Sequence, residues 1–193
     1  MSNIRTGVLC AASVALFAGA AQADELLIID LSVTDEITVT ATDGLSDSTV
    51  SGSDTTGIYL ADFFTADGED LISSSGTGDF TNFLNPSDGS PGIFRAGTGT
   101  DTGLNFWTWS SDFTVDFTAG VQAFTGSATF SLTPAQYADM LAANPTGDIF
   151  FPADGGGDLP QPLLGTYRVF IPAPGAVAIM GLGLGACAAR RRR

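Results

Sequence analysis

Between residues 24 and 170 the sequence contains no cysteine, no histidine and no lysine, and its basic side chains there are Arg95 and Arg168. Without cysteine this region can form no disulfide, even in an oxidising compartment. The lack of cysteine and histidine also excludes common zinc sites and the nucleophilic triads that depend on histidine. Of the usual catalytic groups, carboxylates remain.

The shortage of positive charge is matched by an excess of negative charge. All 21 acidic residues fall between Asp24 and Asp158, whereas five of the seven basic residues lie outside residues 24–170. Such a region repels nucleic acid, anionic lipid and anionic polysaccharide, so no nucleic-acid partner is expected. Aromatic residues set in β-type patterns predict a folded domain despite the high charge.

The first 23 residues have the layout of a secretory signal peptide. Arg5 provides a basic start, Val8 to Ala21 is an apolar run, and Ala21-Gln22-Ala23 is a small-x-small cleavage site before Asp24. We therefore expect export through the Sec translocon and cleavage by signal peptidase after Ala23. Residues 24–170 would form the exported domain.

The last 23 residues form a second targeting segment. Pro172-Ala173-Pro174-Gly175 precedes an apolar stretch that ends at Ala189, and Arg190, Arg191, Arg192 and Arg193 follow. Counted from Val169, the apolar run has about twenty residues, which is enough for a helix to cross a ~30 Å hydrocarbon core. Because arginine-rich flanks stay on the cytoplasmic side, the preceding domain is expected outside the inner membrane.

This tail resembles the PEP-CTERM sorting signal of Gram-negative bacteria, in the Pro-Ala-Pro variant. The family pattern is Pro-Glu-Pro, an apolar helix and a basic tail, and Ala173 stands in this chain at the place of the glutamate. The resemblance covers residues 171–193 and implies processing by an exosortase, a membrane-embedded cysteine transpeptidase, followed by transfer to the cell surface. The alternative is an ordinary C-terminal anchor that is never cleaved.

Residues 24–170 are dominated by short stretches of alternating polarity. Ile37 to Thr42, for example, alternates apolar residues with threonine, which is typical of a half-buried strand. We expect about eight to ten strands, in the ranges 26–33, 37–42, 58–64, 104–109, 113–118, 124–132, 149–151 and 163–170, with weaker strands near residues 50 and 71. Residues 80–94 are interrupted by proline and glycine and are expected to form loops.

One helix is expected, because Thr133-Pro134-Ala135-Gln136 is a capping box with proline at the first helical position. Strands 104–109 and 113–118 are expected to pair as a hairpin. This pattern predicts an all-β fold, an antiparallel β-sandwich of the jelly-roll type. A signal peptide and a transmembrane sorting helix would flank it.

Two groups of residues in the exported domain are candidate binding sites. Asp67, Glu69 and Asp70 place oxygen ligands in a glycine-containing loop, as a calcium site requires, although acidic surface turns have the same composition. Trp107 and Trp109 share one face of their strand, where exposed indoles would stack on the sugar rings of a neutral polysaccharide. The interpretation we favour for Trp107 and Trp109 is that both indoles belong to the core.

No catalytic residue is predicted. Glu25, Glu36 and Glu69 are the only glutamates, and none stands in a spaced acidic motif like those of glycoside hydrolases. We therefore expect a non-enzymatic, exported protein of the cell surface or extracellular matrix with a structural or adhesive role. The alternative is a glycan-binding β-sandwich module, with or without calcium.

Overall fold

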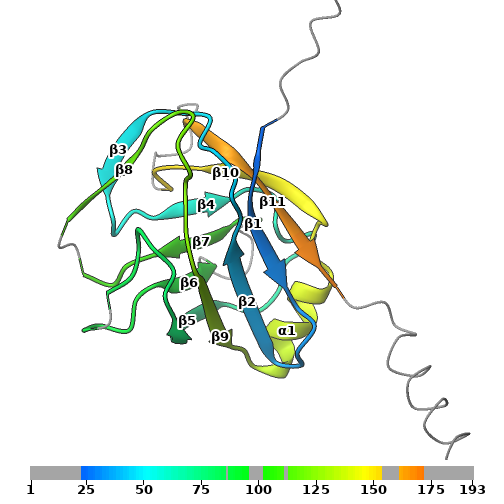
Figure 1. Ribbon diagram of the computed structural model, residues 1–193. Coiled ribbons are helices and arrows are strands. Elements are labelled where there is room, and N and C mark those ends of the chain that lie inside the picture. The colour runs from blue at the N-terminus through cyan, green and yellow to red at the C-terminus, as the bar shows by residue number, and fades with distance from the viewer. Residues whose placement is uncertain (1–22, 86, 96–101, 111–112, 154–160, 172–193) are drawn as a thin grey trace, which may run out of the picture.

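The computed structural model describes residues 23–85, 87–95, 102–110, 113–153 and 161–171. These ranges contain eleven strands and one helix (Figure 1). They are β1 (Glu25–Asp30), β2 (Glu36–Ala41), β3 (Val50–Ser53), β4 (Ile58–Leu60), β5 (Leu71–Gly78), β6 (Gly92–Arg95), β7 (Leu104–Trp107), β8 (Thr114–Phe117), β9 (Ser127–Ser131), α1 (Pro134–Leu141), β10 (Thr146–Phe150) and β11 (Leu163–Phe170). The expected all-β class is confirmed.

Nine of these strands form a closed barrel in the order β1-β11-β10-β4-β7-β6-β5-β9-β2. The ring closes at β1, which pairs with β2 on one side and with β11 on the other. The expected sandwich of two separate sheets is therefore not what the strand pairing shows. Closure satisfies the backbone groups that a sandwich would leave unpaired at its sheet edges.

Apolar side chains fill the barrel. In β2, Ile37 and Val39 are buried while the threonines between and after them point outward, as the alternation predicted. Phe106 of β7 lies at the centre of an aromatic cluster, with ring centroids 4.9 Å from Phe80 and 5.4 Å from Phe130. This interior is a packed core.

A separate two-stranded ribbon of β3 and β8 packs on the barrel. Phe117 of β8 is buried, and its ring centroid lies 5.3 Å from that of Phe124 and 5.1 Å from that of Phe151. The expected hairpin between residues 104–109 and 113–118 is wrong. Strand β7 already pairs with β4 and β6 inside the barrel, so β8 finds its partner in β3.

Helix α1 begins with the predicted capping box. The Gln136 backbone N–H donates to Thr133 Oγ1 over 3.2 Å, and the Thr133 N–H donates to Gln136 Oε1 over 2.9 Å. Met140 is buried, and the Tyr137 hydroxyl donates to the backbone oxygen of Leu31, which ties the helix to the β1–β2 turn. The prediction of this helix from its cap is confirmed.

The two ends of the described chain leave the barrel at opposite ends (Figure 1). Because β1 and β11 are parallel neighbours, with Glu25 beside Thr166 and Asp30 beside Phe170, the start of β1 and the end of β11 lie a strand length apart. Strand β1 begins directly after Asp24, where the mature chain is expected to start. Of the predicted signal peptide, residues 1–22 lie outside the described residues.

Candidate functional site

The two tryptophans lie on the outer surface of the barrel. Along β7, Leu104 and Phe106 point into the core, whereas Trp107 points outward, as the alternation of a strand requires. Trp109 follows on the same side two residues later, and both indoles are partly exposed. The interpretation of these side chains as core residues is therefore wrong.

Phe94 of the neighbouring strand β6 extends this group, and we call Phe94, Trp107 and Trp109 the aromatic face. The Trp107 ring centroid lies 5.1 Å from that of Trp109 and 5.8 Å from that of Phe94. The rings are tilted by 53° and 37° to one another, so they do not cover each other completely. Three adjoining rings with partly exposed surfaces form a platform of the kind on which sugar rings stack.

Gly92 and Gly103 allow aromatic rings to pack directly against the backbone. A Cβ atom on Gly92 would lie 3.0 Å from three atoms of the Trp109 indole, so this ring lies directly on β6. A Cβ atom on Gly103 would overlap the ring of Tyr59, which projects from β4 on the outer side of the barrel. Both rings therefore depend on the absence of a side chain beneath them.

Asn85, Asp88, Ser90 and Ser110 form a hydrogen-bond network, which we call the clasp, and this network binds the backbone of Trp109. The Trp109 backbone N–H donates to Ser90 Oγ over 2.9 Å, and Ser90 Oγ donates to Asp88 Oδ1. The other carboxylate oxygen of Asp88 accepts hydrogen bonds from Asn85 Nδ2 and Ser110 Oγ. The clasp thus joins the loop before β6 to the residues after β7.

Electrostatics favours the charged form of the carboxylate in the clasp. Burial favours neutral Asp88, but the hydrogen bonds from Ser110 and Ser90 outweigh this and hold the pKa of Asp88 below its usual range. A group of this kind is unsuited to act as a general acid, which needs a raised pKa. The clasp therefore holds the Trp109 backbone through an ionised carboxylate.

Three polar atoms on this side of the barrel make no hydrogen bond to the described residues. Asn105 Oδ1, Trp107 Nε1 and Trp109 Nε1 are shielded from solvent and have no hydrogen-bond partner among the described residues. Asn105 and Trp107 are both outward-facing positions of β7, and Trp109 continues the same side. Unsatisfied polar groups are rare in folded proteins, so their presence beside three partly exposed rings marks this surface as unusual.

The turn between β3 and β4 is hydrogen-bonded to the chain just after β7. Asp54 is fully buried, and its backbone oxygen accepts a hydrogen bond from the Thr108 N–H over 3.3 Å. Thr108 lies between the two tryptophans and is itself fully buried. Hydrogen bonds therefore hold the backbone of both Thr108 and Trp109.

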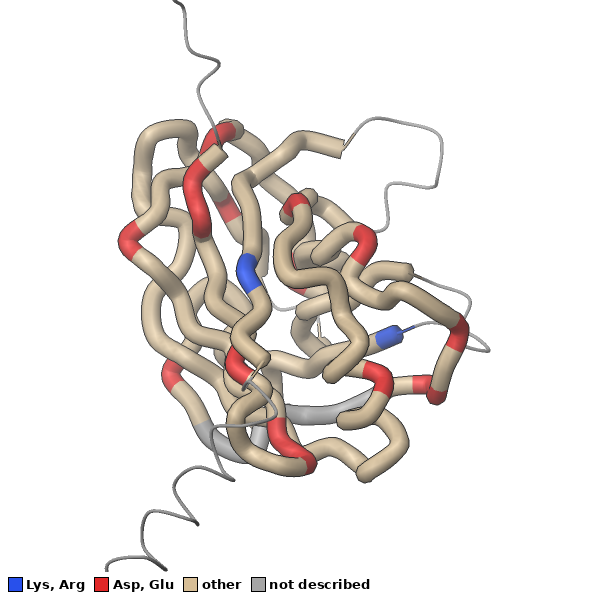
Figure 2. The backbone as a smooth tube through the Cα atoms, turned by 90° about the vertical axis from the view of Figure 1, so that its right-hand side faces the viewer, with Lys and Arg blue, Asp and Glu red and all other residues tan. Residues whose placement is uncertain are grey.

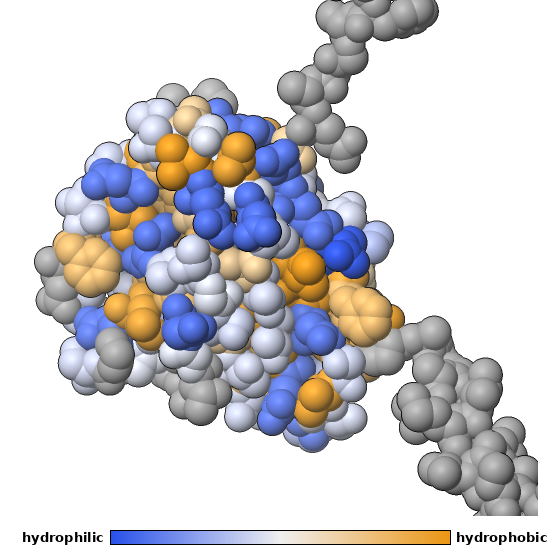
Figure 3. Space-filling view, in the orientation of Figure 1, coloured by the Kyte–Doolittle hydropathy of each residue, from blue (hydrophilic) through white to orange (hydrophobic). Residues whose placement is uncertain are grey.

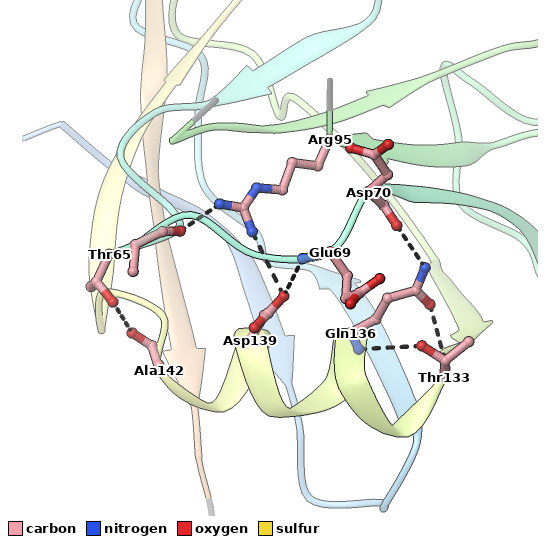
Figure 4. Close-up of polar contacts among 9 residues, drawn as sticks. Thr65, Glu69, Asp70, Arg95, Thr133, Gln136, Asp139 and Ala142 are labelled. Atoms are coloured by element: carbon pink, nitrogen blue, oxygen red, sulfur yellow. Dashed lines mark hydrogen bonds and ion pairs between the residues drawn. The ribbon is translucent and has the colours of Figure 1, made fainter. Parts of the chain in front are cut away.

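The structure does not gather the predicted calcium residues into a metal site. Asp67, Glu69 and Asp70 are exposed, and no group of three or more acidic, histidine or cysteine side chains that could hold a metal occurs in the described part of the chain. The loop is instead bound to α1, since the Glu69 N–H donates to Asp139 Oδ2 and Gln136 Nε2 donates to the Asp70 oxygen (Figure 4). Calcium binding by this loop stays a prediction.

A buried arginine lies behind the acidic loop (Figure 4). The Arg95 guanidinium is 1% exposed, donates to the backbone oxygen of Ala66 and lies 3.9 Å from both Asp139 Oδ2 and the centroid of the Phe64 ring. A Cβ atom on Gly68 would fall 2.8 Å from this guanidinium. A cation at the loop would therefore be repelled by a fixed positive charge.

A second concavity lies near the start of β1. Its volume is about 260 Å³, slightly below the range of ligand pockets. Glu25, one of its lining residues, is engaged by Arg168 over 2.8 Å. The other lining residues are Ala23, Thr146, Gly147, Asp148, Thr166 and Tyr167.

The sorting motif, Pro172, Ala173, Pro174 and Gly175 with Arg190 to Arg193, lies outside the described residues, as does Ala21. Ala23 and Asp24 are described, and Asp24 Oδ2 accepts a hydrogen bond from the Leu45 N–H over 2.9 Å. Among residues 23–171, apart from the undescribed loops, no helix has the length and apolarity needed to cross a membrane. The predicted sorting helix remains a prediction.

Sequence reasoning found the tryptophans but missed Phe94, Tyr59, the clasp and the glycines beneath the rings. The segment 80–94 was expected to form loops, although Gly92–Arg95 is strand β6 and carries Phe94. Its apolar Ile93-Phe94 pair was the available signal. No protein-family model matches this chain, and the searches of curated proteins and of solved structures found no similar protein.

Proposed function

We propose that this protein is an exported, non-enzymatic adhesive component of the cell surface or extracellular matrix, and that its aromatic face binds a neutral polysaccharide. The observation that carries the proposal is the contact between two partly exposed indoles, 5.1 Å apart, on the outer surface of the barrel. Aromatic rings bury the apolar faces of sugar rings, and preorganised rings pay little conformational entropy on binding.

Charge narrows the class of ligand. Both arginines of the described chain are engaged within the protein, Arg95 in the interior and Arg168 with Glu25, whereas acidic residues are spread over the molecule (Figure 2). An anionic polysaccharide or nucleic acid would meet mainly negative charge. A neutral glycan has no such penalty, and its hydroxyl groups can both donate and accept hydrogen bonds.

The C-terminal residues 171–193 are the basis for the proposed location at the cell surface. We propose a PEP-CTERM-like route in which signal peptidase removes residues 1–23, the tail holds the protein in the inner membrane, and an exosortase-type enzyme transfers it to the surface. The support is the Pro-Ala-Pro motif, the apolar stretch and the four arginines in sequence. Mass spectrometry of the native protein should find an N-terminus at Asp24 and the loss of residues beyond about Pro172.

The binding function is tested by replacing the indoles one at a time. Trp107→Ala and Trp109→Ala should each weaken binding to immobilised neutral polysaccharides by about tenfold, because one stacking ring is worth about 1 kcal/mol or more. Phe113→Ala is the matched control, since Phe113 is an exposed aromatic residue (43%) outside the aromatic face. Glycan arrays and affinity electrophoresis measure the effect.

Two outcomes separate the candidate functions. If the unaltered protein binds no neutral glycan, the adhesive proposal fails and a purely structural role in the matrix is favoured. If it binds but the tryptophan variants and Phe113→Ala behave alike, the ligand lies elsewhere on the barrel.

A further inference from the structure

The end of the barrel from which the tail departs has an exposed apolar surface. We call Val33, Leu141, Phe170 and Ile171 the tail-end surface; their side chains are exposed by 54%, 38%, 48% and 36%. Figure 3 shows hydrophobic side chains next to the point where the chain continues beyond β11. Single exposed apolar residues need no explanation, but four around one chain exit do.

Hydrogen bonds join the segments that carry this surface. The Leu31 N–H donates to the Phe170 oxygen over 3.0 Å, so the β1–β2 turn that carries Val33 is fixed to the end of β11. The Val169 N–H donates to the Pro145 oxygen over 2.7 Å, which fixes the segment after α1 to the same strand. The tail-end surface is thus presented by a rigid end of the barrel.

The chain between this surface and the apolar stretch is short. Three residues, 172–174, separate Ile171 from Gly175. Fully extended, these four steps cover at most about 14 Å, and the two prolines favour an extended form near 12 Å. Because Val169 and Phe170 belong to β11, a membrane helix can include only the apolar residues that follow. A helix over residues 175–189 would cover about 22 Å of the ~30 Å hydrocarbon core, so the connection has to cross the remaining ~8 Å and then a headgroup region of about 5–8 Å. This distance takes up the whole length of the connection and holds the end of the barrel at the lipid.

We propose that, before processing, the tail-end surface rests on the headgroup region of the bilayer, with Val33, Phe170 and Ile171 in contact with lipid. This inference rests on the proposed function, because it requires the tail to be inserted in the membrane. The start of β1 then faces away from the membrane, since it lies at the opposite end of the β1–β11 pair. The interface accommodates aromatic and aliphatic side chains of this kind.

Charge at this end favours zwitterionic over anionic lipid. Asp30, Asp35 and Glu36 flank the β1–β2 turn, and the Asp30 carboxylate accepts a hydrogen bond from the Ser32 N–H over 2.8 Å. Anionic headgroups would be repelled by these carboxylates. Contact with phosphatidylcholine vesicles should accordingly be closer than with vesicles rich in phosphatidylglycerol.

The test places a fluorophore on the tail-end surface. The chain that signal peptidase is proposed to leave, Asp24 to Arg193, carries Cys187→Ala, so that a dye attached at Val33→Cys is the only label. It is reconstituted in phosphatidylcholine vesicles that contain headgroup nitroxide lipid. Ser51→Cys is the matched control, because Ser51 is exposed on β3, on the other side of the molecule (Figure 1). Quenching should be severalfold stronger at position 33 than at position 51.

A second pair of variants checks the contact itself. Phe170→Ser with Ile171→Ser should reduce quenching at position 33, whereas Leu45→Ser with Val121→Ser, exposed residues near the start of β1, should leave it unchanged. A thermal melt of each variant confirms that the barrel is folded.

The outcomes of these experiments separate docking of the tail-end surface from the proposed membrane anchor on which it rests. If the chain floats with the vesicles but positions 33 and 51 are quenched alike, the docking of the tail-end surface is overturned and the anchor stands. If the chain does not float with the vesicles, the anchor is overturned and the docking with it.

Discussion

At the scale of single residues, the aromatic face depends on a position without a side chain. Gly92 lies under the Trp109 indole, with a virtual Cβ atom 3.0 Å from three of its atoms. A methyl group there must push the ring away from β6, while the clasp holds the Trp109 backbone in place. The geometry of the platform is therefore set as much by the glycine as by the tryptophan.

Gly92→Ala should alter the near-ultraviolet circular dichroism of the tryptophans and weaken glycan binding, although no aromatic residue has been changed. The control is Gly120→Ala, which meets no atom within 4 Å but has a φ of +77°. That variant should lose about 1 kcal/mol of unfolding free energy from backbone strain, with the tryptophan signal intact. An unchanged spectrum for Gly92→Ala would contradict the close contact.

The two arginines of the described chain provide a second comparison between residues. Arg95 is buried against Phe64 and Asp139, whereas Arg168 and its partner Glu25 are 46% and 38% exposed. The hydrogen bond and charge of Glu25 raise the pKa of Arg168, which favours the charged guanidinium further.

Arg95→Ala should lower the free energy of unfolding by about 3 kcal/mol, because it removes a packed side chain and leaves the Ala66 oxygen without its donor. Arg168→Ala should change stability little, since an exposed ion pair exchanges one set of water contacts for another. Urea denaturation of both variants measures the contrast. Equal losses would show that burial does not determine the role of Arg95.

At the scale of elements, local signals in the sequence were sufficient where a chain segment determines its own structure. The capping box located α1, and alternation of apolar residues with threonine located β2. Strand β6 was missed because Pro91 and Gly92 suggest a loop, and its partners β5 and β7 are needed to recognise it. The β7–β8 hairpin was wrong for the same reason, since pairing is decided between distant segments.

The acidic loop between β4 and β5 yields a prediction at this scale. Because Asp139 and Gln136 already bind the loop backbone and Arg95 lies behind it, calcium should not be needed for its structure. The melting temperature should therefore be the same in 1 mM calcium, about the affinity range of weak extracellular sites, and in EDTA. A midpoint that rises with calcium would show that the loop holds a metal.

At the scale of the whole molecule, net charge opposes compactness. All 21 acidic residues lie between Asp24 and Asp158, and Figure 2 shows those of the described residues at many separate places along the backbone. At low ionic strength their mutual repulsion extends over tens of ångströms, whereas at 1 M salt it extends over about 3 Å. Salt should accordingly stabilise the fold.

Raising sodium chloride from 10 mM to 500 mM should increase the melting temperature by about 3 °C, which corresponds to about 1 kcal/mol for a domain of this size. Chloride is the suitable anion, because sulfate would also strengthen apolar burial. The increase should level off once repulsion is screened. A melting temperature that is independent of salt would mean that the carboxylates lie too far apart to interact.

The closed ring was not foreseen, because nothing near either terminus signals that the first strand and the last strand are neighbours. Five residues of β1 pair with β11, across more than 130 positions of the chain. This pairing gives the fold a high contact order and makes its closure a late event. If the chain crosses the inner membrane from its N-terminus, as we propose, its sheet keeps an open edge until the final strand emerges, and the barrel can close only when translocation of the domain is complete.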